Sequence, residues 1–108
     1  MAVDQEVELL KDGLVRKFSP AKILLFGSRA LESASKDSDI DICVVLDVHN
    51  SKDEIEESIC SYIYDEDGLD FSCSVDVVVY TYWEWEESIK DPGTFASLIL
   101  RKGRVIYG

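Results

Sequence analysis

The first half of the chain alternates between helix-like and strand-like hydrophobic patterns. Apolar residues recur at helical spacing from Val3 to Phe18, which predicts an amphipathic helix that ends at Ser19-Pro20. The short apolar run Lys22–Phe26 is typical of a buried strand. Residues 28–38 are small and polar and leave room for one helical turn and a loop. From Asp39 to Leu46 acidic and apolar residues alternate before the run becomes fully apolar, which predicts a second strand entering a core.

The second half of the chain continues with a helix and a strand of high β-branched content. Asn50-Ser51 is a plausible N-cap for a helix that presents apolar residues from Ile55 to Ile63. The stretch Phe71–Tyr80 predicts a third strand. Two short helices and a closing strand are expected at residues 83–90, 94–102 and 104–107.

This order of elements predicts one mixed β-sheet flanked by helices, an α+β fold. The chain has 108 residues, of which 46% are hydrophobic, enough to bury a core but too few for two domains of ordinary size. We therefore expect a single domain spanning residues 1–108.

The charge of the chain excludes one class of function. Twenty-two acidic residues stand against 11 basic ones, a formal net charge of −11, so a basic groove for nucleic acid is not expected. The N-terminus lacks a basic, apolar signal sequence, and no apolar run approaches the roughly 18 residues of a membrane span. The three cysteines, Cys43, Cys60 and Cys73, are typical of buried thiols in a reducing compartment. These features favour a cytoplasmic protein.

Three carboxylates lie within apolar strands, where solvation alone explains them poorly. Residues i and i+2 of a strand share a face, so Asp39 and Asp41 project side by side while their neighbours point into the core. Asp76 lies in a run of valines that face the other way. If the two strands are neighbours, the three carboxylates converge, and such oxygen ligands suit Mg²⁺. For an isolated Asp-x-Asp pair, a solvated strand end would remain the simpler interpretation.

The segment before this pair makes a phosphate site the stronger hypothesis. Gly27 follows a buried strand directly and allows the backbone to approach a phosphate closely. Ser28 adds a hydroxyl, and a helical turn after it would offer free backbone N–H groups.

Together these residues resemble a known signature. Gly27-Ser28-Arg29-Ala30 followed by Ser38-Asp39-Ile40-Asp41 is similar to the motif of the DNA polymerase β-like nucleotidyltransferase superfamily, whose palm-like fold is a mixed sheet with helices. The small size resembles the minimal nucleotidyltransferases in particular. The resemblance extends along the chain through Asp76 to the closing Gly-x-Val-Ile-Tyr at 103–107.

The resemblance implies a role for each site residue. Asp39, Asp41 and Asp76 would be the metal-binding and catalytic carboxylates, and Asp76 is the candidate general base. Two Mg²⁺ ions would lie about 3.5–4 Å apart between them. Nucleotide would be bound at Gly27, Ser28 and Arg29. The reaction would be attack of an acceptor hydroxyl on the α-phosphate of a nucleoside triphosphate such as ATP, with release of pyrophosphate.

The resemblance also implies a partner. Small proteins of this kind act as antitoxins that transfer AMP to a tyrosine of a HEPN-type toxin, and a short chain leaves little room for a dedicated acceptor pocket. Two alternatives stay open: transfer to a small molecule such as an aminoglycoside, or an inactive antitoxin that acts by binding alone. Leu31 and Glu32, where many members have Arg-Gly, favour the inactive form.

Other conspicuous residues have simpler interpretations. Tyr82-Trp83-Glu84-Trp85 could stack on a base or bind a partner, but packing of alternate members under the last helix is favoured. The remaining acids, on the predicted helix after residue 51 and in the turn at 65–70, are expected to form solvated faces.

Overall fold

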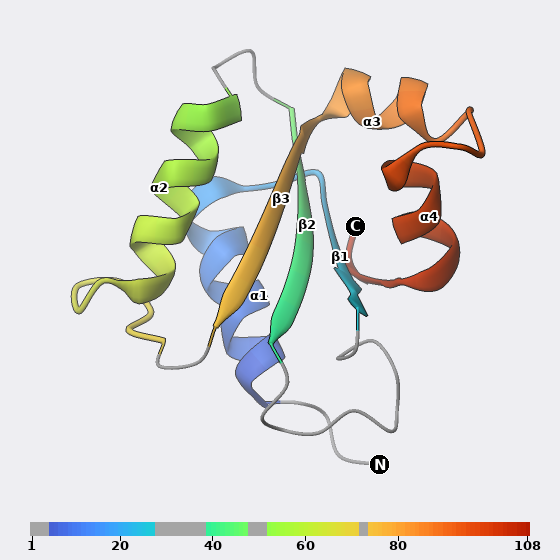
Figure 1. Cartoon of the computed structure of the whole chain (residues 1–108). Coiled ribbons are helices and arrows are strands. Elements are labelled where there is room, and N and C mark those ends of the chain that lie inside the picture. The colour runs from blue at the N-terminus through green and yellow to red at the C-terminus, as the bar shows by residue number, and fades with distance from the viewer. Residues whose placement is uncertain (1–4, 28–38, 48–51, 72–73) are drawn as a thin grey trace.

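The computed structural model describes residues 5–27, 39–47, 52–71 and 74–108 of the chain (Figure 1). It contains four helices and four strands within these ranges. In chain order the elements are α1 (Gln5–Phe18), β1 (Lys22–Phe26), β2 (Ile40–Leu46), α2 (Lys52–Tyr64), β3 (Val75–Thr81), α3 (Tyr82–Ser88), α4 (Phe95–Lys102) and β4 (Arg104–Tyr107).

The four strands form one mixed sheet in the order β3-β2-β1-β4. β1 pairs antiparallel with both β2 and β4, whereas β2 and β3 run parallel. The parallel pair is connected through α2, which lies alongside β3 in Figure 1. This is the α+β architecture that the order of elements predicts, and β3 forms one edge of the sheet.

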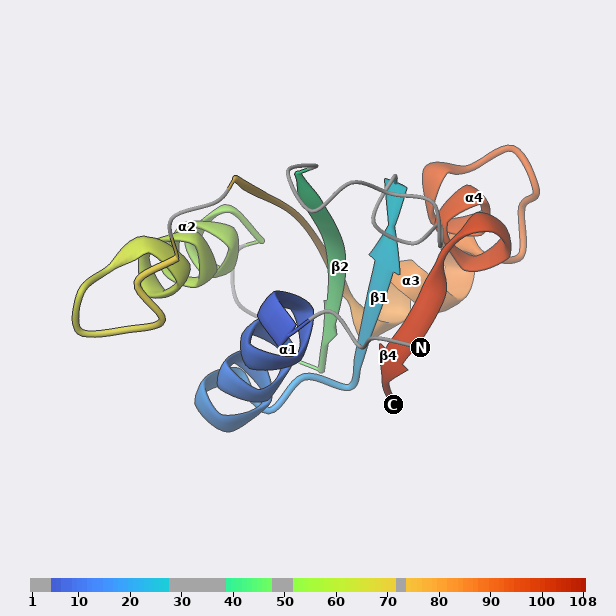
Figure 2. The same ribbon diagram turned by 90° about the horizontal axis from the view of Figure 1, so that it is seen from below.

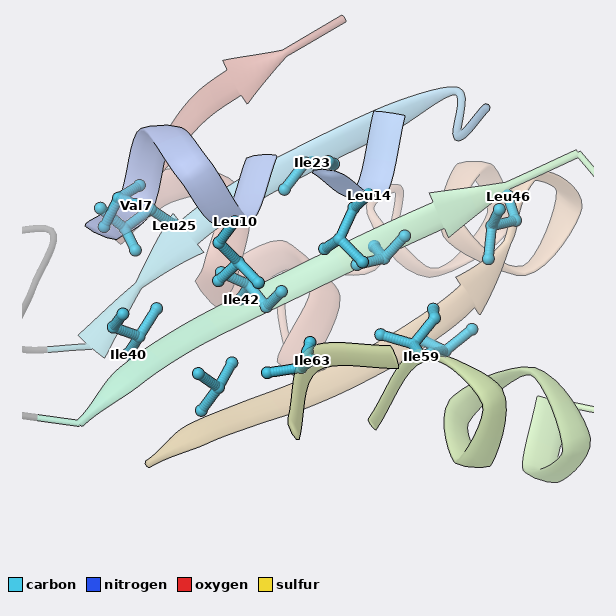
Figure 3. Packing of buried hydrophobic residues seen from close by; sticks show 13 residues of the cluster. Val7, Leu10, Leu14, Ile23, Leu25, Ile40, Ile42, Leu46, Ile59 and Ile63 are labelled. Carbon is cyan, nitrogen blue, oxygen red and sulfur yellow. The ribbon is translucent and has the colours of Figure 1, made fainter. Parts of the chain in front are cut away.

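Helices cover both faces of the sheet. Figure 2 shows α1 and α2 on one side and α3 and α4 on the other. On the first side, Leu10 and Leu14 of α1 meet Ile42 of β2, and Ile59 and Ile63 of α2 complete the layer (Figure 3). These side chains are at most 1% exposed, and burying each contributes about 1.5–3 kcal/mol to folding.

The second face carries a smaller core. Trp85 of α3 and Ile99 of α4 pack on Leu24, Cys43 and Val45 of the sheet. Both helices begin at a threonine whose hydroxyl accepts a backbone N–H bond, Thr81 for α3 and Thr94 for α4. These N-caps satisfy amide groups that would otherwise lack partners and so fix where each short helix begins.

Most predicted elements are present, with shifts at their ends. The strands at 22–26 and 104–107 have the predicted bounds, whereas the third strand begins at Val75 and not at Phe71. The predicted turn in 28–38 and the cap at Asn50-Ser51 lie outside the described residues. Within the described ranges, no helix has the length and apolar character needed to cross a membrane.

The aromatic run at 82–85 follows the prediction only in part. Trp85 is 1% exposed and packs with Ile99 of the last helix, as expected, while Tyr82 and Trp83 are 43% and 50% exposed. Alternate residues are not buried together because the run lies on a helix, where residues i and i+2 face different directions.

The cysteines follow the prediction only in part. Cys43 is fully buried, and burial raises the pKa of its thiol to about 12, so it stays protonated and unreactive. Cys60 is a free, partly buried thiol, and Cys73 lies outside the described residues.

Candidate functional site

Asp41 of β2 and Asp76 of β3 lie directly beside each other in the sheet. They are register partners in the parallel ladder, so their side chains leave the same face about 4.8 Å apart at the backbone. The neighbouring residues Ile40, Ile42 and Val75 point to the opposite face and are buried in the main core. The apolar residues therefore fix the face on which the two carboxylates stand.

The two carboxylates differ in their exposure to solvent. Asp41 lies on an inner strand and is partly buried, whereas Asp76 lies on the edge strand and is exposed. Burial raises the pKa of Asp41 from 3.8 to about 6, and the hydrogen bond with Asp76 and the charges of Asp76 and Asp39 add to this shift. Below a pH of about 6 the Asp41 carboxyl holds a proton, and a divalent cation bound between the two carboxylates would displace it.

Gly27 follows β1 directly and lies next to the pair Asp41–Asp76. Its φ is +71°, a left-handed conformation that favours glycine, and a Cβ built on it would collide with Oδ2 of Asp41. Phe26, the residue before it, is the register partner of Asp41 in the antiparallel ladder. The glycine thus lets the end of β1 turn away at the point where the Asp41 carboxylate needs room.

Asp39 stands at the entrance to β2 and is exposed. Its charge contributes to the raised pKa of Asp41, which places it close enough to act on the pair. Within the described ranges, however, no three His, Cys, Asp or Glu side chains form a group that could hold a metal ion. The pair Asp41–Asp76, with Asp39 nearby, could therefore hold a cation only together with further ligands such as water or substrate oxygens.

Two predicted nucleotide-binding residues, Ser28 and Arg29, lie outside the described residues. Of the three residues predicted for this role, the structure describes only Gly27. The contribution of the other two stays a prediction.

Tyr64 is a contributor that sequence reasoning missed. Its hydroxyl, at the end of α2, accepts the Val75 N–H at 2.8 Å and donates to the Val75 carbonyl at 3.1 Å. Ile40 donates to the carbonyl of Ser74, so the groups of Val75 face away from β2, along the free side of the edge strand. Tyr64 therefore fixes the backbone directly before Asp76. No local pattern marks this residue, because its partner lies 11 positions further along the chain.

The exposed aromatic residues of α3 do not belong to this site. Asp76 is near the start of β3 and Tyr82 follows its end, six residues later. At about 3.3 Å per residue, the two ends are roughly 20 Å apart. Tyr82 and Trp83 are therefore too far away to stack on a base bound at the carboxylates.

A cleft of about 550 Å³ lies elsewhere, along α2 and the turn that follows it, and it also reaches Lys17 of α1. Its lining includes Glu54, Glu57, Asp65 and Lys17, and it includes neither Asp41 nor Asp76. The surplus of acidic groups would repel a triphosphate. The chemistry of the carboxylate pair therefore locates the candidate site better than the size of this cleft does.

Comparison with known families agrees with the geometry. Residues 7–99, most of the chain, match the family described as the nucleotidyltransferase domain. The chain therefore belongs to the nucleotidyltransferase domain family, which confirms the resemblance to the minimal nucleotidyltransferases of the polymerase β-like superfamily. The match includes Gly27, Asp41 and Asp76. No curated protein matches the chain.

Proposed function

We propose that this chain is a Mg²⁺-dependent nucleotidyltransferase that moves a nucleotide, AMP from ATP, to a hydroxyl group of a partner protein. The observation that carries the proposal is the pairing of Asp41 with Asp76 beside Gly27, in a chain of the nucleotidyltransferase domain family. The paired acids would bind the cation, and the glycine would let the backbone approach a phosphate closely.

The residues present fit Mg²⁺. Burial raises the pKa of Asp41, and the repulsion between the two adjacent carboxylates raises it further. Mg²⁺ is commonly bound through one or two carboxylates, with waters and substrate phosphates as its other ligands. When bound, the metal would lower the pKa of an acceptor hydroxyl and neutralise charge on the departing pyrophosphate.

The chain's own residues would divide the remaining work. Asp41, as a carboxylate, would hold the cation from the partly buried side of the pair. Asp76, exposed on the edge strand, can also accept a proton from an approaching hydroxyl, the role of a general base. Gly27 would let the triphosphate approach the end of β1, because it places no side chain there.

A protein acceptor is supported by the openness of the site. Asp76 stands on an edge strand with its side chain exposed, so a bulky acceptor can bring a tyrosine or serine hydroxyl to it. The resemblance to minimal nucleotidyltransferases makes a HEPN-type protein the first partner to test, in a toxin–antitoxin pair.

The experiment uses ATP labelled at either the α- or the γ-phosphate, with Mg²⁺ and a purified HEPN-type protein encoded beside this chain. We expect the α-label to appear on the partner and the γ-label to be released as pyrophosphate. D41N and D76N should abolish transfer, while D67N, a matched change in an exposed turn, should leave it unchanged.

Two results would overturn the proposal. Transfer of the γ-label would indicate a kinase reaction instead. A wild-type protein that binds neither Mn²⁺ nor Mg-ATP would indicate an inactive protein that acts by binding alone.

A further inference from the structure

An aromatic pair adjoins the candidate site at the end of β1. Phe26 is the register partner of Asp41, so their side chains share a face with Cβ atoms about 4.5–5.5 Å apart. The ring of Phe95, the first residue of α4, meets the ring of Phe26 edge to face, with centroids 5.8 Å apart and an interplanar angle of 90°. The Phe95 ring therefore lies on the order of 10 Å from the Asp41 side chain.

Phe95 is exposed, whereas the two residues that follow it in α4, Ala96 and Ser97, are buried. Ala96 and Ile99 face the sheet and are at most 1% exposed, whereas Phe95 is 48% exposed. The Phe26 ring covers part of the Phe95 ring, and about half of the Phe95 surface is open to solvent. A large apolar surface of this kind beside a polar site is available for a ligand.

The start of α4 holds Phe95 in place. The Thr94 hydroxyl donates to the carbonyl of Ser88 at 2.6 Å and accepts the N–H of Ser97 at 3.2 Å. These bonds fix the backbone on both sides of Phe95, and the Phe26 ring limits its rotation. A ligand that stacks on the ring would therefore lose little free energy in ordering it.

We propose that the exposed face of Phe95 is the platform on which the nucleobase of the bound triphosphate stacks. The inference rests on the proposed function, which puts the reacting phosphate at Asp41 and Asp76, one ribose away from the base. The distance from Asp41 to Phe95 through Phe26 suits that separation. Every base has an aromatic face, so a stacking platform tolerates different bases and favours the larger purines over pyrimidines.

Among the described residues, no other exposed aromatic ring contacts the register partner of Asp41. Trp83 is equally exposed, but it lies near the far end of β3. This gives a control within the same chain: an aromatic of similar exposure that should not touch the nucleotide.

The test compares two probes that differ by the nucleoside, Mg-ATP and magnesium tripolyphosphate, by calorimetry on the full chain. F95A should weaken binding of Mg-ATP about 5- to 150-fold, the range measured when a stacking aromatic is removed, and leave tripolyphosphate binding unchanged. F95W should bind Mg-ATP at least as tightly as the wild type, and W83A should bind both probes normally. A nuclear Overhauser effect between the adenine protons and the Phe95 ring in the wild type supplies a second measurement that needs no variant.

The outcomes separate the two proposals. If the wild type binds both probes and F95A binds Mg-ATP as tightly as the wild type, the platform is wrong and the proposed function stands. If F95A weakens the binding of both probes equally, the stacking proposal is also wrong, because Phe95 would then act on the phosphate site. If the wild type binds neither probe, the proposed function fails and the platform fails with it.

Discussion

Asp41 and Asp76 are neighbours because β2 and β3 run parallel and in register, although 34 residues separate them in the chain (76 − 41 − 1). The inner strand holds the partly buried carboxylate and the edge strand holds the exposed one. One backbone pairing therefore creates two acids with different surroundings, and burial raises the pKa of the inner one, Asp41, to about 6.

The first prediction concerns pH and stability in the metal-free protein. The pKa of Asp41 is about 6 in the folded state against 3.8 as its ordinary value, so its proton binds more tightly to the folded form. This contribution to stability is present below pH 4 and is lost as the pH rises through about 6. Asn at this position carries no charge at any pH. D41N should therefore gain stability relative to the wild type between pH 4 and pH 7, measured by urea unfolding with a chelator.

The control for this measurement is D67N, whose difference from the wild type should stay constant over the same range. A difference between D41N and the wild type that does not change with pH would contradict the raised pKa.

The second prediction concerns metal. At pH 7.5, Mg²⁺ at 100 times its dissociation constant should stabilise the wild type by about 2.7 kcal/mol, because only the folded state has both carboxylates in place. D41N and D76N should lose this stabilisation, and a chelator should reverse it in the wild type. Thermal unfolding with and without Mg²⁺ measures the effect. Equal stabilisation of all three proteins would show that the ion binds elsewhere.

The third prediction concerns Gly27. G27A should cost about 1–2 kcal/mol for the left-handed backbone, and more because its Cβ collides with the Asp41 carboxylate. In a D41A background the contacts with Oδ2 and Cγ are gone and only the Cβ of residue 41 remains, at 3.2 Å, so G27A should cost little more than the backbone term. Urea unfolding of the four proteins gives the coupling free energy, which we expect to be at least about 0.5 kcal/mol.

Gly93 offers the matched control for this cycle. A Cβ there would come no closer than 3.4 Å to Asp91 Oδ1, so G93A should cost far less than G27A. An equal cost of G27A in both backgrounds would rule out contact between Gly27 and Asp41.

The fourth prediction concerns Tyr64. Y64F keeps the ring but removes the hydroxyl that holds both backbone groups of Val75, so we expect a loss of about 1–2 kcal/mol in unfolding free energy. The Val75 amide should exchange with solvent faster, while the inner-strand amides near Cys43 should change little. Hydrogen exchange followed by NMR measures both, and Y107F on the exposed closing strand is the control. Unchanged exchange at Val75 would show that Tyr64 does not hold the edge strand.

Local patterns in the sequence determined a large part of the structure. The bounds of β1 and β4 follow from short apolar runs that end at Gly27 and begin after Gly103. The alternation around Asp41 and Asp76 fixed the face of each carboxylate, because a strand sends neighbouring residues to opposite sides. These are properties of a few consecutive residues, because the directions of neighbouring side chains follow from local backbone geometry alone.

Only the tertiary structure decided which residues meet. The sequence left open whether β2 and β3 are neighbours, and their parallel register is what sets Asp41 against Asp76. The contacts of Phe95 with Phe26 and of Tyr64 with Val75 also join separate elements, and the packing of α3 buries Trp85 while Trp83 stays exposed. Local periodicity carries no information about such pairings, since they depend on how whole elements pack to bury their apolar faces. The sequence determined which side chains could carry chemistry, and packing of the sheet determined which of them lie together.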